Sequence, residues 1–407
     1  MDNQITNIGI VRESRIDEHR SPIIPQHIES LRIKYPNLIF TLQPSNTRCY
    51  SNEEYENSGA NINEDLSSSS IIFGVKEIDR KFLINNKTYL FFSHTFKISN
   101  DKNEIDENKR DLLLSVIDKK IRLIDYENIR DKSTARYLGF GRFAGIIGCY
   151  NTLNLCLEVF QKQPLARAYK INNYQRLVSN LKNLYFPKLK ILITGDGRVS
   201  NGVIELLKET NMKEVSKNEF LNNNFDVPIY CNLKTIDYIK NNFSDSFNLN
   251  DFINNPKNYS SNAINYLKKA NVLISAHYWD PDSPKIFEVN DLQNLLNLKV
   301  VGDITCDING SIPTTIRSST IENPNYWVDK NINEIAKNDE GIAVMAVDNL
   351  PSELPREASE EFSLNIVNEV IPFLINKDDG RILNGTIASN GSFLEKYHYL
   401  KDYINHV

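Results

Sequence analysis

The sequence has no long run of apolar residues and no secretory leader pattern at its start. No window reaches the roughly 18 apolar residues that a membrane-spanning helix needs. The opening residues, "MDNQITNIGIVRESR", lack the charged segment followed by an apolar one that marks a signal peptide. We therefore expect a cytoplasmic protein with no membrane partner.

Closely spaced cysteines are also missing. The five cysteines are scattered, without a C-x-x-C motif and without a histidine at the spacing of a zinc site: Cys49, Cys149, Cys156, Cys231 and Cys306. This pattern is typical of reduced thiols in a cytosol. We expect neither disulfides nor a metal site.

Positive charge is not in excess. The chain has 47 lysines and arginines against 52 aspartates and glutamates, a formal net charge of -5, and the two signs are mixed along the sequence. Proteins that bind nucleic acid usually carry a basic surface, so we expect no nucleic-acid partner.

What the chain does have is enough length and apolar content for two folded domains. Its 407 residues exceed the usual size of one hydrophobic core. Apolar residues make up 41% of the sequence and aromatic residues 10%, as in ordinary globular proteins.

Strand and helix patterns alternate in the first 130 residues. "NIGIV" and "LIFTLQ" predict strands on either side of "SPIIPQHIESLRIK", where Ile24, Ile28 and Leu31 have the spacing of an amphipathic helix. "SIIFGV", "TYLFFSH" and "IRLIDYE" predict three more strands. We expect an open α/β sheet. The segment 141–182, with few residues that break helices, is predicted to be helical.

A glycine-rich turn opens a second α/β series. In "ILITGDGRVSNG", Gly195 and Gly197 directly follow an apolar strand, and Gly202 lies in the helix that begins there. Only positions without a side chain let backbone N–H groups approach a pyrophosphate at the start of a helix. The turn therefore predicts a dinucleotide site, although Gly197 and Gly202 are farther apart in sequence than the last two glycines of G-x-G-x-x-G.

The next strand bears on which dinucleotide binds. NAD(H) sites usually have an acidic residue at the end of this strand for the adenosine ribose, whereas "MKEVSK" is predicted to end in Ser216 and Lys217. A hydroxyl and an amine suit a 2′-phosphate. We therefore favour NADP(H) over NAD(H), with Glu214, two residues earlier, as the alternative ribose ligand.

Three ionisable residues follow three apolar strands of the first half. Lys76 follows "IIFGV", His94 follows "TYLFFS" and Glu127 ends "IRLIDYE". Ligands of open α/β sheets bind at the carboxyl ends of the strands. The sequence thus predicts a catalytic edge in a domain that precedes the dinucleotide domain.

Eight segments, in order, resemble one enzyme family. They are "VRESRIDEHRSPIIP", "GVKEI", "YLFFSHT", "IDYE", "GFGRFAG", "GDGRVSNG", "VGDITCDINGSIP" and "VDNLPSELPREAS". Together they are similar to the lysine-ketoglutarate reductase domain and the lysine-forming saccharopine dehydrogenases, within the alanine dehydrogenase and transhydrogenase group. The resemblance implies reversible reduction, by a nicotinamide cofactor, of the imine formed between L-lysine and 2-oxoglutarate. The product would be saccharopine.

The resemblance also implies roles for individual residues. Lys76 matches the family's catalytic lysine and His94 its acid–base histidine, while Glu77 and Glu127 match acidic groups that tune them. Arg20 resembles a substrate-carboxylate arginine, and Asp348 an aspartate near the nicotinamide. Arg142 and Phe143 of "FGRFAG" lie where the two domains meet and are expected to contact the substrate. The expected cofactor contacts are Gly195, Gly197, Arg198, Val199, Gly202, Ser216, Lys217 and Asp303.

The implied fold is two Rossmann-like α/β domains with parallel sheets, separated by a substrate cleft, with C-terminal helices returning to the first domain. We expect a substrate domain over 1–147, completed by 351–407, and a dinucleotide domain over 148–350. Two other functions remain open. One is an opine-type reductive aminase that joins a different amine to a 2-oxo acid, and the other is a non-catalytic, dinucleotide-bound sensor.

Overall fold

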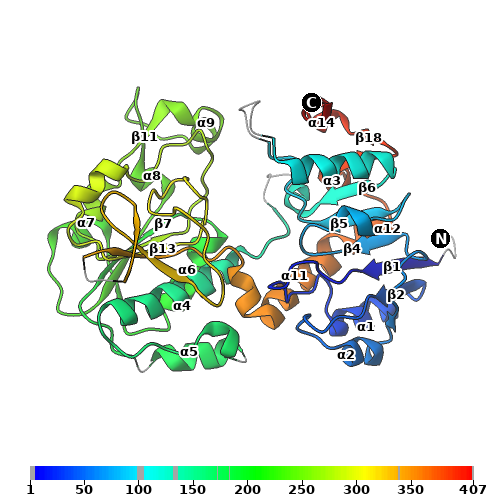
Figure 1. Ribbon diagram of the computed structural model, residues 1–407, viewed down its shortest axis with the longest axis horizontal. Coiled ribbons are helices and arrows are strands. Elements are labelled where there is room, and N and C mark those ends of the chain that lie inside the picture. Colours follow the sequence, from blue (N-terminus) through cyan, green and yellow to red (C-terminus); the bar gives the residue numbers. More distant parts are fainter. Residues whose placement is uncertain are drawn as a thin grey trace. The chain divides into compact units, whose positions relative to one another are not determined.

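The computed structural model describes residues 5–98, 105–131, 136–171, 173–182, 184–337 and 340–405 (Figure 1). The chain divides into two compact units, Met1–Gly139 together with Pro355–Val407, and Phe140–Leu354. The predicted return of the C-terminal helices to the first unit is confirmed. The expected boundary at 147 falls inside a helix, and the division comes before that helix begins.

The first unit is a mixed sheet covered by helices. Its elements are β1 (Thr6–Ile10), α1 (Pro25–Lys34), β2 (Leu38–Leu42), α2 (Asn52–Asn57), β3 (Asn61–Ile62), β4 (Ile71–Phe73), η1 (Arg80–Phe82), β5 (Thr88–Phe91), α3 (Glu107–Asp118), β6 (Arg122–Asp125), η2 (Tyr126–Asn128), α11 (Pro355–Glu369), α12 (Ile371–Ile375), α13 (Arg381–Gly385), β17 (Thr386–Ser389), β18 (Ser392–Phe393), η7 (Glu395–Tyr397) and α14 (Leu400–Asn405). The strand order is β18-β17-β6-β5-β4-β1-β2-β3.

The register of this sheet aligns the ends of three strands. Strands β4, β5 and β6 are parallel neighbours, and Phe73 pairs with Leu90, which in turn pairs with Ile124. Their side chains are buried, as expected for strands covered on both faces. The turns that follow the three strands therefore start at the same edge of the sheet.

The second unit repeats the α/β plan. Its elements are α4 (Gly141–Val159), η3 (Ala168–Lys170), α5 (Tyr174–Lys182), β7 (Lys190–Thr194), α6 (Arg198–Leu207), β8 (Lys213–Glu214), α7 (Lys217–Asn222), β9 (Ile229–Leu233), α8 (Thr235–Tyr238), β10 (Ile239–Asn241), α9 (Leu249–Asn254), η4 (Pro256–Asn258), β11 (Tyr259–Ser261), α10 (Ile264–Leu267), β12 (Val272–Ser275), η5 (Val289–Asn294), β13 (Val300–Asp303), β14 (Asn325–Val328), β15 (Glu334–Ile335), β16 (Ile342–Met345) and η6 (Leu350–Glu353). The main sheet has the order β15-β14-β16-β13-β12-β7-β9-β8, with antiparallel strands only at the β15-β14 edge.

Two α/β units with largely parallel sheets confirm the predicted fold class. The continuous helix expected over 141–182 is wrong, because α4 ends at Val159 and α5 begins at Tyr174. The backbone turns at Gln161, whose φ of 55° is left-handed, and Pro164 lacks the N–H that would continue a helix.

Helices α4 and α6 pack closely through a pair of glycines. A Cβ on Gly202 would lie 2.1 Å from the carbonyl oxygen of Arg142, and a Cβ on Gly145 would lie 2.0 Å from that of Val199. No side chain fits at such a distance. Helix α4 also contacts β12, β13 and β16, so the glycine pair fixes the first turns of α6 against a buried helix.

Candidate functional site

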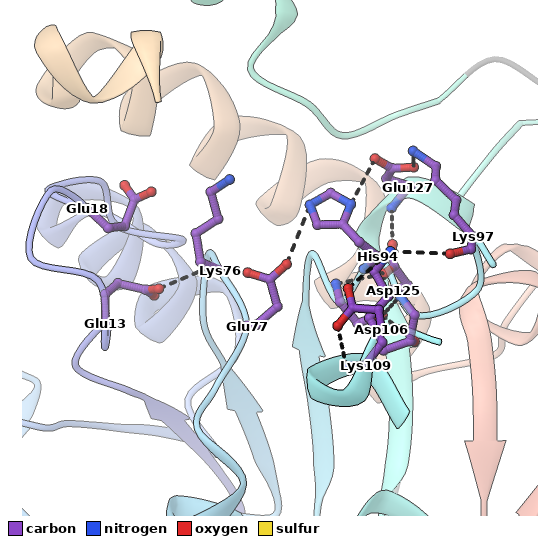
Figure 2. A network of polar contacts seen from close by, with 12 residues as sticks. Glu13, Glu18, Lys76, Glu77, His94, Lys97, Asp106, Lys109, Asp125 and Glu127 are labelled. Carbon is purple, nitrogen blue, oxygen red and sulfur yellow. Dashed lines mark hydrogen bonds and ion pairs between the residues drawn. The ribbon is translucent and has the colours of Figure 1, made fainter. Parts of the chain in front are cut away.

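The turns after β4, β5 and β6 bring Glu77, His94 and Glu127 together at one edge of the first unit's sheet (Figure 2). His94 lies between the two carboxylates. Its Nδ1 is 3.4 Å from Glu127 Oε1, and its Nε2 is 3.8 Å from Glu77 Oε1. The imidazole therefore has one ring nitrogen facing each acidic side chain.

Lys76 rises from the same turn as Glu77 (Figure 2). Its side chain is half-buried, and among the described residues no hydrogen bond or ion pair holds its amino group. The amino group of Lys76 is therefore available to contact a ligand at the same sheet edge as His94. The edge thus offers an amine, an imidazole and two carboxylates for proton transfer.

Asp125, the last residue of β6, holds the turns that carry His94 and Glu127. One carboxylate oxygen accepts hydrogen bonds from the backbone N–H groups of Ser93 (2.8 Å) and His94 (3.1 Å) and from Ser93 Oγ (2.5 Å). The other oxygen accepts from the Glu127 N–H at 2.8 Å. His94 has a left-handed φ of 51°, which costs energy in a residue with a side chain. A fully buried carboxylate stabilises that conformation.

Glu127 is the most strongly paired of these acids. Its side chain is only 8% exposed, and its Oε2 lies 2.8 Å from Lys97 Nζ and 3.3 Å from Arg136 Nη2. Burial alone would raise the pKa of Glu127, but the contact with His94 and the two cations outweigh it and hold that pKa well below its usual range. Glu127 is therefore an anion throughout the neutral pH range.

Glu13, which sequence reasoning missed, holds the turn that carries Lys76. Its carboxylate accepts hydrogen bonds from the backbone N–H groups of Val75 (2.7 Å) and Lys76 (3.0 Å). Burial, reinforced by the negative charge of Glu18, raises the pKa of Glu13 from 4.5 to about 7. The residue sits in the motif quoted for Arg20, but only the fold reveals which backbone groups it meets.

Glu13→Gln should make folding stability less dependent on pH. The folded protein holds the Glu13 proton more tightly than the unfolded chain, so this group stabilises the fold below pH 4.5, and the contribution is lost as the pH rises through about 7. The full effect corresponds to roughly 3 kcal/mol. Urea unfolding at several pH values should show a flatter profile for Glu13→Gln than for the wild type. The exposed Glu29→Gln is the matched control, and an unchanged profile in Glu13→Gln would contradict the assignment.

Arg20 is buried and paired within the chain. Its guanidinium forms two hydrogen bonds with Glu18, from Nε at 2.7 Å and from Nη2 at 2.5 Å, and the residue is 4% exposed. Charge pairing with Arg20 keeps the pKa of Glu18 low although burial opposes this. The substrate-carboxylate role stays a prediction, and any ligand would share the guanidinium with Glu18.

The glycine-rich turn lies between β7 and α6 in the second unit. Gly195 has a left-handed φ of 119°, and a Cβ there would lie 2.5 Å from the carbonyl oxygen of Ala276. A Cβ on Gly197 would meet nothing within 4 Å, and no side chain caps the helix that begins at Arg198. The start of α6 therefore has open space over Gly197 and no side-chain cap, an arrangement that suits an anion.

The strand that precedes Ser216 ends earlier than the sequence predicts. Strand β8 ends at Glu214, and Ser216 caps α7, where its hydroxyl accepts from the Glu219 N–H and donates to the Glu219 carboxylate at 2.7 Å. Lys217 forms an ion pair with Asp237, which raises the pKa of the lysine. Both predicted phosphate ligands already have partners, and the acidic Glu214 stands at the strand end.

Asp303 is a buried organising residue at the end of β13. Its carboxylate accepts from Thr305 Oγ1 and Thr315 Oγ1, both at 2.6 Å, and from Ser275 Oγ. Burial raises the pKa of Asp303 although these hydroxyls oppose it. The residue is 0% exposed, so a direct contact with a cofactor would require these bonds to rearrange.

The remaining predicted residues also lie in the second unit. Asp348 is exposed in the turn after β16. Arg142 forms a two-point ion pair with Glu205, at 2.6 and 2.7 Å, and its guanidinium lies 5.1 Å from the ring centroid of the buried Phe143. Arg142 thus links α4 to α6. This ion pair is compatible with a structural role for Arg142 and with a role in ligand binding.

The described residues contain neither a candidate membrane span nor a cluster of metal-binding side chains. None of the helices there is both long and apolar enough to cross a membrane. In the same part of the chain, no three histidine, cysteine, aspartate or glutamate side chains gather as a metal would require.

Two family models match the chain. The family model of the alanine dehydrogenase/PNT N-terminal domain matches residues 9–147. The family model of the C-terminal domain matches residues 229–393. The alpha-aminoadipic semialdehyde synthase of Rattus norvegicus is 28% identical over 94% of this chain and 46% of its own length. A saccharopine dehydrogenase (NAD(+), L-lysine-forming) of Neurospora crassa is 22% identical over 92% of each chain.

Solved structures agree on the fold. An L-alanine dehydrogenase superposes with a TM-score of 0.65 at 12% identity, covering 98% of this chain and 100% of its own. A transhydrogenase from Sinorhizobium meliloti gives 0.58 at 11% identity, over 95% and 98%. The chain spans about half the length of the first curated relatives it matches. It belongs to the alanine dehydrogenase/PNT family, and its sequence relatives include alpha-aminoadipic semialdehyde synthases and L-lysine-forming saccharopine dehydrogenases.

Proposed function

We propose that this chain is a nicotinamide-dependent oxidoreductase that joins L-lysine to 2-oxoglutarate and releases saccharopine, in a reversible reaction. The observation that carries the proposal is the cluster of Lys76, Glu77, His94 and Glu127 at one sheet edge. The names of the sequence relatives support the same reaction.

The proposed chemistry needs several proton transfers. The neutral amine of lysine attacks the carbonyl carbon, the addition product loses water to give an imine, and reduction of the imine gives a secondary amine. The attacking nitrogen must lose a proton, and the departing oxygen must gain one. Lys76 and His94 supply groups for these transfers, with the His94 ring oriented by Glu127 on one side and Glu77 on the other.

The second unit fits a nicotinamide dinucleotide, which supplies or accepts a hydride when it is bound. The open space over Gly197 and the uncapped start of α6 suit a pyrophosphate. Glu214 is the side chain we propose for the adenosine ribose, because it ends β8 where an acidic residue is usual in NAD(H) sites. Asp348 remains a proposed contact of the nicotinamide end.

The structure gives reasons to reverse the expected preference for NADP(H). A 2′-phosphate would compete with Asp237 for Lys217, and Glu214 would repel it. We expect NADH to bind at least as tightly as NADPH, and Glu214→Ala to weaken NADH binding about tenfold, the loss of one hydrogen bond to a charged group. Lys217→Ala should leave NADH binding unchanged. Fluorescence titration of both cofactors tests this. If NADPH binds more tightly than NADH and Lys217→Ala removes that difference, the preference for NADP(H) predicted from the sequence is correct.

An opine-type aminase is the second candidate. The cluster supplies proton transfer for any amine, and none of its four members specifies lysine. A spectrophotometric screen of 2-oxoglutarate with lysine and with other amines, each with NADH and with NADPH, separates the two. A sensor without activity would oxidise neither cofactor in any combination.

A further inference from the structure

A buried histidine of the second unit adjoins the glycine-rich turn, and the proposed proton transfers do not use it. His277 lies two residues after β12, and only 9% of it is exposed. Strand β12 is a parallel neighbour of β7, with Ser275 opposite Thr194, so His277 follows the same end of the sheet as the turn. A Cβ on Gly195 would lie 3.0 Å from the Cα of His277. The backbone of His277 therefore packs against the turn itself.

The imidazole of His277 joins two segments of the unit. Its Nδ1 lies 2.7 Å from Thr194 Oγ1, at the end of β7, and its Nε2 lies 2.9 Å from Ser311 Oγ, in the segment after β13. Thr194 and Ser311 are both fully buried. Burial lowers the pKa of His277 to about 4, so the ring is neutral at pH 7, with one nitrogen that donates and one that accepts. The two hydroxyls therefore satisfy both ring nitrogens.

Thr194 connects the imidazole to the glycine-rich turn. It is the last residue of β7 and directly precedes Gly195, whose left-handed φ of 119° begins the turn. Loss of the bond to His277 would leave the buried Thr194 hydroxyl without that partner, which favours a shift of the threonine toward another one. Such a shift would move the backbone that leads into α6. Small misplacements of groups that contact a ligand weaken its binding.

We propose that His277 is a positioning residue for the nicotinamide cofactor, and that it acts by holding the start of the glycine-rich turn through Thr194. This inference rests on the part of the proposed function that assigns a nicotinamide dinucleotide to the turn. It gives the two ring nitrogens different roles. The Nδ1 contact supports cofactor binding, and the Nε2 contact with Ser311 supports only the fold.

Asparagine and glutamine separate the two contacts. The amide of asparagine is as many bonds from Cα as Nδ1 of histidine, and the amide of glutamine is as many bonds away as Nε2. His277→Asn can therefore keep the bond to Thr194, whereas His277→Gln can keep only the bond to Ser311. Fluorescence titration of the full chain with NADH measures the Kd. We expect His277→Gln to raise the Kd about tenfold, as for one lost hydrogen bond, and His277→Asn to leave it near the wild-type value.

The free energy of unfolding separates positioning from a purely structural role. Each amide variant leaves one of the two buried hydroxyls without its partner, so both variants should be destabilised by similar amounts in urea unfolding. A histidine that only stabilises the unit would then change the NADH Kd equally in His277→Asn and His277→Gln. Different Kd values at similar stability are the signature of positioning.

Variants of the two hydroxyl residues complete the test. Thr194→Val removes the hydroxyl but keeps the shape of the side chain, and it should raise the NADH Kd as much as His277→Gln. The double variant should show no further rise, because both changes remove the same contact. Ser311→Ala is the matched control and should keep a Kd near the wild-type value. Thr194→Val decides the question if His277→Gln does not fold.

The outcomes keep this inference separate from the proposed reaction. A higher Kd in His277→Gln and Thr194→Val, with a wild-type Kd in His277→Asn, supports the role of His277 whether or not the chain turns over lysine. Equal changes in the two amide variants, or a wild-type Kd in Thr194→Val, would overturn that role and leave the proposed function intact. A folded wild-type chain that binds neither NADH nor NADPH would overturn both.

Discussion

Lys76→Met and His94→Gln should each lower kcat by about 10²-fold or more, with the fold and dinucleotide binding unchanged. Both side chains stand at the carboxyl edge of a sheet whose register is fixed by buried strands, so neither substitution disturbs the core. Met keeps the length of lysine and Gln keeps a polar group, but neither side chain can act as a general acid or base. Steady-state kinetics with circular dichroism and cofactor titration measure the three quantities.

Controls for these variants lie on the same unit. Lys34→Met removes an exposed lysine at the end of α1, and His398→Gln removes an exposed histidine after η7. Both should keep wild-type rates. If Lys76→Met and His94→Gln also keep near-normal rates, the strand-end lysine and histidine are surface residues and the first unit has another role.

Asp125→Asn should have the second largest effect, on both stability and turnover. Asp125 accepts four hydrogen bonds and donates none, so either orientation of an asparagine amide points its NH₂ at another donor. Loss of these buried contacts should cost roughly 2–4 kcal/mol. We also expect a fall in kcat of about 10-fold or more, because the left-handed backbone of His94 loses its support.

Ser93→Ala distinguishes positioning from general destabilisation. It removes one of the four hydrogen bonds to Asp125 but leaves the backbone contacts of His94 and Glu127 in place. Chemical denaturation should show a smaller loss than in Asp125→Asn, and kcat should stay near the wild-type value. If Asp125→Asn lowers the free energy of unfolding but keeps a normal kcat, the carboxylate stabilises the fold and does not position His94 for catalysis.

Much of the framework could be predicted from hydrophobic patterns. The alternation of apolar strands and amphipathic helices gives two α/β units, and the positions of Lys76, His94 and Glu127 follow from the strand ends. The supporting acids could not be found in this way. Glu13 and Asp125 act through hydrogen bonds to backbone groups of other turns, and the sequence does not reveal those partners.

The predicted strand end at Ser216 and Lys217 is wrong for a physical reason that the sequence partly contains. "SKNE" is a capping box, with Ser216 and Glu219 at its ends, so the helix begins at Lys217 and the strand must stop earlier. The predicted strand "MKEVSK" is longer and includes the apolar residue Val215. For Asp303, burial among three hydroxyls is a tertiary property that a strand-end position does not disclose.

One assay tests the proposed reaction most directly. The purified chain is mixed with 2-oxoglutarate, L-lysine and NADH or NADPH, and loss of reduced cofactor is followed by absorbance while the product is identified by mass spectrometry. We predict oxidation that requires both substrates, forms saccharopine and is abolished by Lys76→Met. Two results would contradict the proposed function. One is cofactor oxidation when one of the two substrates is left out, and the other is no oxidation by a chain that is folded and binds the cofactor.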